Sequence, residues 1–232
     1  MLPTLSGLAA NKKYPEFRHT LGQGLSYLAF ANLVSAAIAL SLAEPIVRLI
    51  FERGKFGPAD TIRAAHTLAC LAPGLLMFSM NNILARAFYA LNDIKTPMRI
   101  SIVCLTVNLL FALWLVQPYR AAGLGVANTL SATLNTALLI YALRRKLARL
   151  ELMSLVNTLL LLVPNAVLAG LVAGALAWLW NQQLGHATLA MKLGMVFVPG
   201  GIAGLVYFLV ALWLKVPAAR EMFTAVRQKL GK

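Results

Sequence analysis

The feature that most constrains this chain is a succession of long apolar runs separated by short polar turns. The runs lie at about residues 21–49, 62–91, 97–116, 121–143, 152–180 and 189–214. Roughly 20 consecutive apolar residues are enough to cross the hydrocarbon core of a bilayer as a helix. The sequence therefore predicts an all-α, polytopic transmembrane helix bundle with six full spans, preceded at residues 1–10 by the end of another helix.

The composition agrees with a membrane protein. Of the 232 residues, 60% are hydrophobic and only 12% are charged, whereas about a quarter of a soluble domain is charged. The net charge of +14 comes from basic residues gathered in the turns, not from one basic face with stacking aromatics as nucleic-acid binding requires. We therefore expect membrane lipids, and no nucleic acid, as partners.

The distribution of basic residues predicts an orientation. If the turn at residues 92–95 is cytoplasmic, the inner segments hold fifteen Lys and Arg residues and the outer segments hold six. The strongest cluster, from Arg144 to Arg149, then also lies inside. Since basic residues concentrate in cytoplasmic loops, we expect a multi-pass protein with both ends in the cytoplasm.

The turn between the second and third runs carries recognisable helix signals. Asn92 and Asp93 compete for backbone hydrogen bonds and are expected to end the preceding helix. Thr96 and Pro97 are expected to start the next one, with Thr96 as its cap. The sequence predicts a tight cytoplasmic hairpin, which we call the inner turn.

Polar side chains near this turn are the candidates for substrate contact or gating. An amide or guanidinium group within a span needs a partner or water, so such groups often face a cavity. The candidates are Asn81, Asn82, Arg86, Asp93 and Lys95.

Two further sets of residues have both a functional and a packing interpretation. Asn108, Asn128 and Thr129 could form a cation site between the third and fourth runs, although hydrogen bonding between helices is the simpler interpretation. Two GxxxG pairs in the last two runs predict close packing of those helices on each other. The pairs are Gly170 with Gly174 and Gly200 with Gly204.

The sequence contains no catalytic set that would indicate an enzyme. His19, His66 and His186 are scattered, and no zinc, phosphate-binding or nucleophile motif is present. No carboxylate lies in the middle of a run, so we expect neither a metal site nor a cofactor. The Pro73-Gly74 and Pro199-Gly200-Gly201 breaks are instead typical of transporter helices that line a cavity.

Three motifs in order resemble the MviN/MurJ family of lipid II flippases, within the MOP transporter superfamily. They are similar to the family's P-x-L-S, EPIV-LLFERG-F and FYA--D-KTP segments, and they lie at residues 2–10, 43–56 and 88–97. The resemblance is strong over residues 1–149 and weak beyond them. It implies a bundle of fourteen helices in two lobes around a cationic cavity, followed by two extra helices.

The resemblance also implies a division of this chain. Residues 1–149 would be part of the carboxy-terminal lobe, from the end of the eighth helix through the twelfth. Residues 150–214 would be the two extra helices, and residues 215–232 a basic cytoplasmic tail. The chain is then expected to be a carboxy-terminal fragment, inactive alone, whose missing amino-terminal half carries the family's essential arginines.

The implied activity is the transfer of the undecaprenyl-pyrophosphate-linked peptidoglycan precursor across the bacterial inner membrane by alternating access. In this interpretation Gly170, Gly174, Gly200 and Gly204 would shape a groove for the lipid tail. Two alternatives remain. One is another MOP carrier, such as an O-antigen or drug exporter, against which the KTP and FERG segments argue. The other is a membrane scaffold fragment without transport activity.

Overall fold

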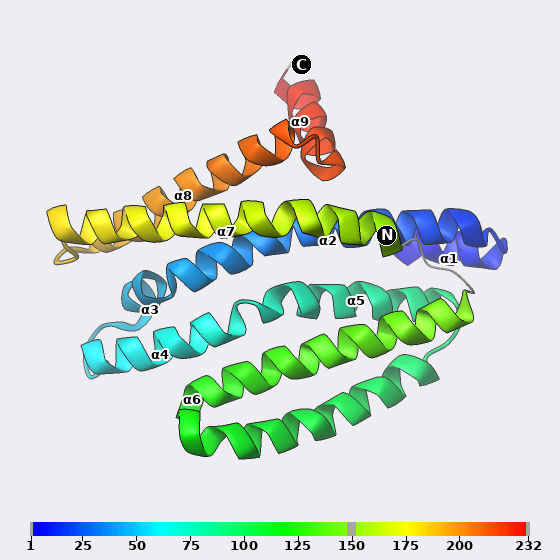
Figure 1. Ribbon diagram of the computed structural model, residues 1–232, viewed down its shortest axis with the longest axis horizontal. Helices are drawn as coiled ribbons and strands as arrows, with labels where there is room; N and C mark the ends of the chain where they lie inside the picture. Colours follow the sequence, from blue (N-terminus) through cyan, green and yellow to red (C-terminus); the bar gives the residue numbers. More distant parts are fainter. Residues whose placement is uncertain (1, 148–151, 231–232) are drawn as a thin grey trace.

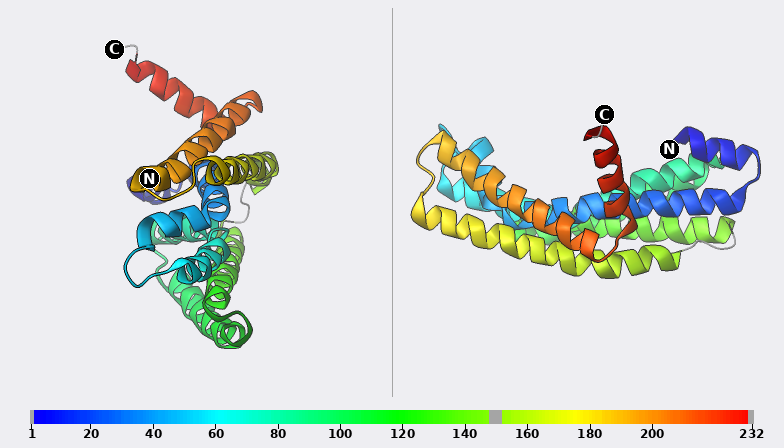
Figure 2. Two further views of the ribbon diagram at one scale, coloured as in Figure 1. Left: turned by 90° about the vertical axis from the view of Figure 1, so that its left-hand side faces the viewer. Right: turned by 90° about the horizontal axis from the view of Figure 1, so that it is seen from above.

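The computed structural model describes residues 2–147 and 152–230, and every regular element in those ranges is an α-helix (Figure 1). The long helices lie side by side, and α9 leaves the bundle at a steep angle (Figure 2). The elements are α1 (Leu2–Ala10), α2 (Tyr14–Ser41), α3 (Ala43–Phe51), α4 (Pro58–Leu71), α5 (Gly74–Ala90), α6 (Lys95–Lys146), α7 (Leu152–Gln183), α8 (Leu189–Trp213) and α9 (Pro217–Leu230). The predicted all-α membrane fold is confirmed.

The number of spans depends on how the broken helices are counted. Within the described ranges, α2, α6, α7 and α8 are each long and apolar enough to cross a membrane, and the bent pair of α4 and α5 could form a fifth span. Helix α6 folds back on itself at Arg120, where φ is 49° (Figure 1). This break falls in the turn that the sequence predicts at residues 117–120. Counting the two limbs of α6 separately would give six spans, which stays a prediction.

The first predicted run is not one helix. The chain breaks at Leu42, between α2 and α3, and α2 begins at Tyr14 rather than near residue 21. Pro45 lies in the first turn of α3. Its ring cannot donate a backbone hydrogen bond, and it would clash with the carbonyl of Ser41 in a continuous helix. The prediction of an uninterrupted helix over residues 21–49 is therefore wrong.

The predicted kink at Pro73-Gly74 is confirmed, because α4 and α5 meet there at a bend of 45°. The Thr129 hydroxyl of α6 donates to the Cys70 carbonyl at 2.9 Å, just before the kink. A Cβ atom on Gly74 would lie 2.9 Å from the Thr129 Oγ1 atom. Glycine at this position therefore allows α6 to approach the broken helix closely.

Helix α2 is the centre of the packing, with contacts to α5 on one side and to α7 on another. The buried stripe of α7 includes Ala166, Ala169, Ala173 and Ala177. Small side chains at such spacing let neighbouring helices approach closely. The apolar core is therefore continuous from α5 through α2 into α7.

The glycine pairs do not join α7 to α8 as the sequence predicts. A Cβ atom on Gly170 would meet Ser41 and Ala37 of α2, and one on Gly200 would meet Leu42 and Ile38. A Cβ atom on Gly204 would meet nothing within 4 Å. A GxxxG spacing permits close approach but does not say to which helix, and here the approach at Gly170 and Gly200 is to the α2–α3 segment.

The predicted division at residues 149 and 150 lies outside the described residues, as do Arg149 and the last two residues of the tail. The division into lobe, extra helices and tail stays a prediction. Residues 217–230 of the predicted tail form α9.

Candidate functional site

The inner turn of the sequence lies between α5 and α6, and we call it the α5–α6 turn. Helix α5 ends at Ala90, and Asn92 has a left-handed φ of 55°. The backbone N–H of Asn92 donates to the Tyr89 carbonyl, and the backbone N–H of Asp93 donates to the Phe88 carbonyl, both at 3.0 Å. This pair of bonds satisfies carbonyls that the helix end would otherwise leave free. The predicted helix end is confirmed.

Asp93, not Thr96, caps the start of α6. Its carboxylate accepts the Thr96 backbone amide at 3.0 Å and the Thr96 hydroxyl at 2.8 Å. An acidic side chain before a helix satisfies free amides and interacts favourably with the positive end of the helix dipole. The prediction of Thr96 as the cap is wrong, because its hydroxyl is used as a donor to the carboxylate.

The same carboxylate joins the two ends of α6. Lys146 Nζ, in the last turn of α6, lies 2.6 Å from Asp93 Oδ2. This hydrogen bond, together with those from Thr96, outweighs burial and lowers the pKa of Asp93 from its usual value to about 2. Asp93 is therefore ionised at neutral pH and holds both limbs of α6 at the α5–α6 turn.

The other charged candidates near this turn do not join the Asp93 cluster. Lys95 and Arg86 are exposed. Lys146, which the sequence shows only as one member of a basic cluster, is the functional partner that sequence reasoning missed. No local signal identifies it, because 53 positions separate the two residues.

An amide-lined cavity of about 320 Å³ lies between α5 and the two limbs of α6. Its polar lining comes from Asn81, Asn82, Tyr89, Ser101 and Asn135. The structure therefore brings two of the candidates, Asn81 and Asn82, to one cavity. Asn135 of the second limb of α6 completes it.

The amides of this cavity differ in how well they are satisfied. Asn81 donates to the Ala132 carbonyl at 3.3 Å and accepts the Thr136 hydroxyl at 2.8 Å. Asn82 donates to the Phe78 carbonyl of its own helix at 3.1 Å. The Asn135 Oδ1 atom is buried and has no hydrogen-bond partner among the described residues. The cavity thus offers a neutral acceptor that a hydroxyl, amide or water could use.

The three cation-site candidates do not converge on one point. Asn108 donates to the Asn128 Oδ1 atom at 2.7 Å and so links the two limbs of α6. Thr129 instead points to the Cys70 carbonyl of α4. Within the described ranges, no group of three His, Cys, Asp or Glu residues could hold a metal ion.

Of the four lipid-groove candidates, one lines an apolar cavity. This cavity has a volume of about 350 Å³ and lies between α2, α7 and the bend of α4 with α5. Gly170 lines it, together with apolar side chains such as Leu33, Leu76 and Val167. Gly174, Gly200 and Gly204 lie outside its lining.

A charged network lies at the opposite end of the bundle from the α5–α6 turn. Glu44 and Arg48, four residues apart on α3, form an ion pair at 2.6 Å. Glu52 extends this pair into a network. Its carboxylate lies 3.1 Å from Arg48 and 3.3 Å from Lys192 of α8. It also accepts a hydrogen bond from the Thr61 hydroxyl of α4 at 2.9 Å. Although burial alone would raise the pKa of Glu52, these three donors lower it. We call this cluster the far-end network.

Helices of spanning length, a broken helix pair and an amide-lined cavity together define a polytopic membrane protein of the transporter type. The family described as lipid II flippase MurJ has a model that matches residues 1–194 of this chain. The chain therefore belongs to the MurJ family of lipid II flippases.

Relatives and a solved structure agree with this assignment. The probable lipid II flippase MurJ of Haemophilus influenzae is 34% identical over 191 residues, which cover 79% of this chain and 36% of that protein. The probable lipid II flippase MurJ of Synechocystis is 28% identical over 216 residues, covering 93% of this chain and 40% of that protein. The chain thus spans about two fifths of these curated relatives.

A solved structure, lipid II flippase MurJ in an inward closed conformation, has a TM-score of 0.69 and 18% identity. The match covers 91% of this chain and 41% of that one. At this identity the likeness shows the fold alone. The helix arrangement of a MurJ transporter is therefore present over nearly the whole chain.

Proposed function

We propose that this chain is the carboxy-terminal part of a transporter that moves lipid II from the inner to the outer leaflet of the bacterial inner membrane. The observation that carries the proposal is the family match over residues 1–194. The matched region contains the α5–α6 turn and the far-end network. The role is transport by alternating access, without catalysis of a covalent step.

The α5–α6 turn is suited to couple helices at an inner gate. Asp93 holds the start of α6, and through Lys146 it also holds the end of α6. A change in the position of α5 is then transmitted to both limbs of α6 together. Arg86 lies one helical turn after Asn82 on α5 and is exposed, so it can contribute positive charge beside the amide-lined cavity.

The neutral amides suit the uncharged parts of the substrate. Sugar hydroxyls and peptide amides can pair with Asn81, Asn82 and the free Oδ1 atom of Asn135. The apolar cavity beside Gly170 suits a segment of the lipid tail. For Gly174, Gly200 and Gly204 we propose only that they shape the surface of α7 and α8.

The basic residues support a topology with both ends in the cytoplasm, and the α5–α6 turn on the same side. The relatives are more than twice as long as the matched region. We propose that flipping requires the parts of the relatives that this chain does not cover, and that the 232-residue chain alone does not transport lipid. Asn108, Asn128 and Thr129 remain candidates for a cation contact in that larger assembly.

Complementation of a flippase-depleted bacterium tests the proposal. The chain is fused to the part of the Haemophilus influenzae relative that precedes the matched region, and growth is scored when the native flippase is depleted. We expect growth with the fusion, and loss of growth with Asp93→Asn or Arg86→Ala. Lys55→Ala changes an exposed basic residue in the α3–α4 connection and is the matched control. If the intact Haemophilus influenzae relative restored growth and the fusion did not, the proposed function would be contradicted.

A further inference from the structure

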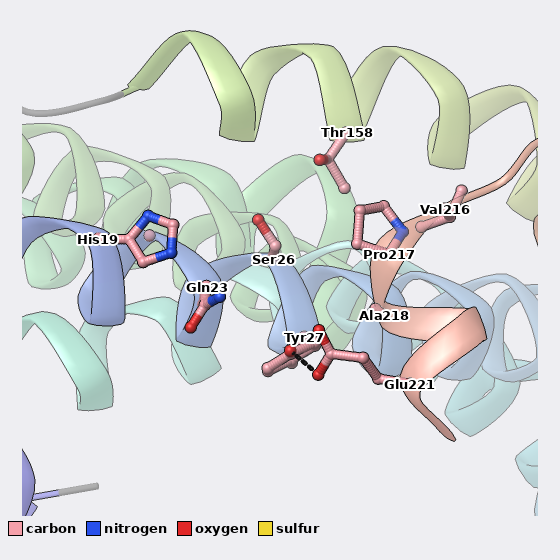
Figure 3. A pocket seen from close by; sticks show the side chains of 10 residues that line it. His19, Gln23, Ser26, Tyr27, Thr158, Val216, Pro217, Ala218 and Glu221 are labelled. Atoms are coloured by element: carbon pink, nitrogen blue, oxygen red, sulfur yellow. Dashed lines mark hydrogen bonds between the residues drawn. The ribbon is translucent and has the colours of Figure 1, made fainter. Parts of the chain in front are cut away.

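A small, mainly apolar cavity with several polar side chains, unrelated to the sites above, lies where α9 meets the bundle. It has a volume of about 240 Å³ and is enclosed by α2, α7 and the link from α8 into α9 (Figure 3). Its polar lining comes from His19, Gln23, Ser26, Tyr27, Thr158 and Glu221, and the rest is apolar. We call it the α9 cavity.

Among the residues that line the α9 cavity, Glu221 is the one acidic side chain, and neither Lys nor Arg is present. The Tyr27 hydroxyl donates to Glu221 Oε2 (Figure 3). This bond fixes the carboxylate of α9 against α2. In a chain with a net charge of +14, this cavity thus carries a carboxylate and no Lys or Arg, and the other titratable side chains of its lining are His19 and Tyr27. A carboxylate beside an aromatic ring favours a cation and disfavours a phosphate.

The position of the cavity along the bundle suggests the level of lipid head groups. Helix α8 ends at Trp213, which is 80% exposed, and Trp side chains are enriched at the membrane–water interface. The chain then turns at Lys215 and enters α9, which leaves the bundle (Figure 2). Met222 and Phe223 of α9 are also exposed, so α9 carries apolar side chains beside the cavity. An amphipathic helix of this kind lies in the interface.

The size and chemistry of the cavity restrict the ligand. Pockets for drug-sized molecules have volumes of roughly 300–1,000 Å³, so about 240 Å³ suits a small head group. A primary ammonium has three N–H donors, and Glu221, Ser26 and Gln23 supply oxygen acceptors. A trimethylammonium group has no N–H donor. Lys215 and Arg220 are exposed on the same segment and are available to the neighbouring lipid phosphate.

We propose that the α9 cavity binds the primary ammonium head group of a phospholipid such as phosphatidylethanolamine, with Glu221 as the anionic contact and Tyr27 as the residue that orients it. The lipid would fasten α9 to α2 and α7 at the membrane surface. This proposal concerns lipid binding by the chain itself, so its failure would leave the proposed transport role untouched.

Native mass spectrometry of the 232-residue chain in detergent tests the proposal. The probes are synthetic phosphatidylethanolamine, phosphatidylcholine and phosphatidylglycerol with identical acyl chains. We expect about tenfold stronger retention of phosphatidylethanolamine than of the other two, which corresponds to about 1.4 kcal/mol, because hydrogen bonds between ionised groups are stronger than those between neutral groups. Glu221→Gln should remove this preference.

Three controls make the outcome specific. Glu221→Asp keeps the charge and should retain most of the preference, and Tyr27→Phe should weaken it about threefold, so these variants decide the case if Glu221→Gln does not fold. Glu16→Gln changes an exposed acid in the first turn of α2 and should have no effect. Equal retention of the three lipids, or an unchanged preference in Glu221→Gln, would overturn the proposal. Displacement of the lipid by millimolar free ethanolamine would show that the site takes a soluble amine instead.

Discussion

The α4–α6 unit and the α7–α8 pair both pack against α2, but different interactions hold them. In the α4–α6 unit, hydroxyl groups of α6 bond to backbone carbonyls of neighbouring segments. Thr129 donates to Cys70 of α4 at 2.9 Å, Ser131 donates to Cys104 on the other limb at 2.8 Å, and Thr136 lies 3.3 Å from the Met77 carbonyl of α5. The polar contacts are spread along the unit.

In the α7–α8 pair, two polar contacts of the described residues lie at one level, where they join α7 to α8 and α8 to α2. Asn165 of α7 donates to the Tyr207 carbonyl of α8 at 2.9 Å, and the Tyr207 hydroxyl donates to the Phe30 carbonyl of α2 at 2.9 Å. The rings of Phe30 and Tyr207 lie 5.2 Å apart. Apolar packing, to which the buried alanines of α7 contribute, supplies much of the remaining contact.

This difference predicts different tolerance to substitution. Single hydrogen bonds between helices in a membrane contribute about 0.6–2 kcal/mol. Loss of one contact in the α4–α6 unit leaves several others, whereas loss of the Tyr207 side chain removes both the hydroxyl bond and the ring contact to Phe30 of α2. The α7–α8 pair should therefore detach from α2 more readily than the α4–α6 unit separates.

The largest effect is expected for Tyr207→Ala, which should destabilise the protein by about 3 kcal/mol, because Tyr207 is 1% exposed and a buried aromatic leaves a large cavity. Tyr207→Phe removes the hydroxyl alone and should cost about 1 kcal/mol. Thermal unfolding in detergent, with protease protection of α7 and α8, measures both. Equal effects of the two variants would show that the hydroxyl, not the ring, dominates.

Gly123→Ala should come next and should act on the α4–α6 unit. A Cβ atom there would overlap the backbone carbonyl of Leu115 on the other limb of α6. Because backbone cannot move aside cheaply, we expect a loss of about 2 kcal/mol. Gly204→Ala is the matched control, since nothing lies within 4 Å of its added Cβ atom. Similar melting temperatures for the two variants would contradict the close approach of the limbs.

The Asp93 cluster predicts a pH dependence. Its pKa is lowered from 3.8 to about 2 in the folded protein, so its contribution to stability is fully present above about pH 5 and is lost as pH falls toward 2. We expect the loss to be on the order of 1–2 kcal/mol, because the Asp93 side chain is only 16% exposed. Unfolding of wild type and Asp93→Asn between pH 7 and pH 3 measures it. A pH profile that is identical in both would exclude Asp93 as the cause.

The smallest effect is expected for Thr136→Val, about 1 kcal/mol, because it removes one hydroxyl bonded to Asn81 Oδ1 and leaves the other polar contacts of α6. Combining it with Thr129→Val should give roughly the sum of the single effects. Melting temperatures of the three variants test this. A double variant that lost far more than the sum would show that the contacts act as one network rather than as distributed links.

The sequence predicts the local features of this fold well. Pro73 bends a helix because proline has no backbone N–H to donate. Glu44 and Arg48 form an ion pair because they are four residues apart on α3. The contacts Asp93–Lys146 and Glu52–Lys192 span 53 and 140 positions. They depend on helix packing, which no local pattern encodes.

The candidate site follows the same rule. The sequence identifies Asn81 and Asn82 as polar side chains within a predicted span, and both line a cavity. The cation-site prediction places Asn128 and Thr129 together, but adjacent helical residues point in different directions, and Thr129 donates to Cys70 of α4. The GxxxG spacing predicts close approach between α7 and α8, whereas Gly170 and Gly200 instead approach the α2–α3 segment.

The central claim is that this chain supplies part of a lipid II flippase and does not flip lipid alone. The most direct measurement is the translocation of a fluorescent lipid II analogue in proteoliposomes. The 232-residue chain is compared with the fusion that carries the preceding part of the Haemophilus influenzae relative. We predict a background rate for the chain alone and clear translocation for the fusion. Robust translocation by the chain alone, or none by the fusion when the intact relative is active, would contradict the claim.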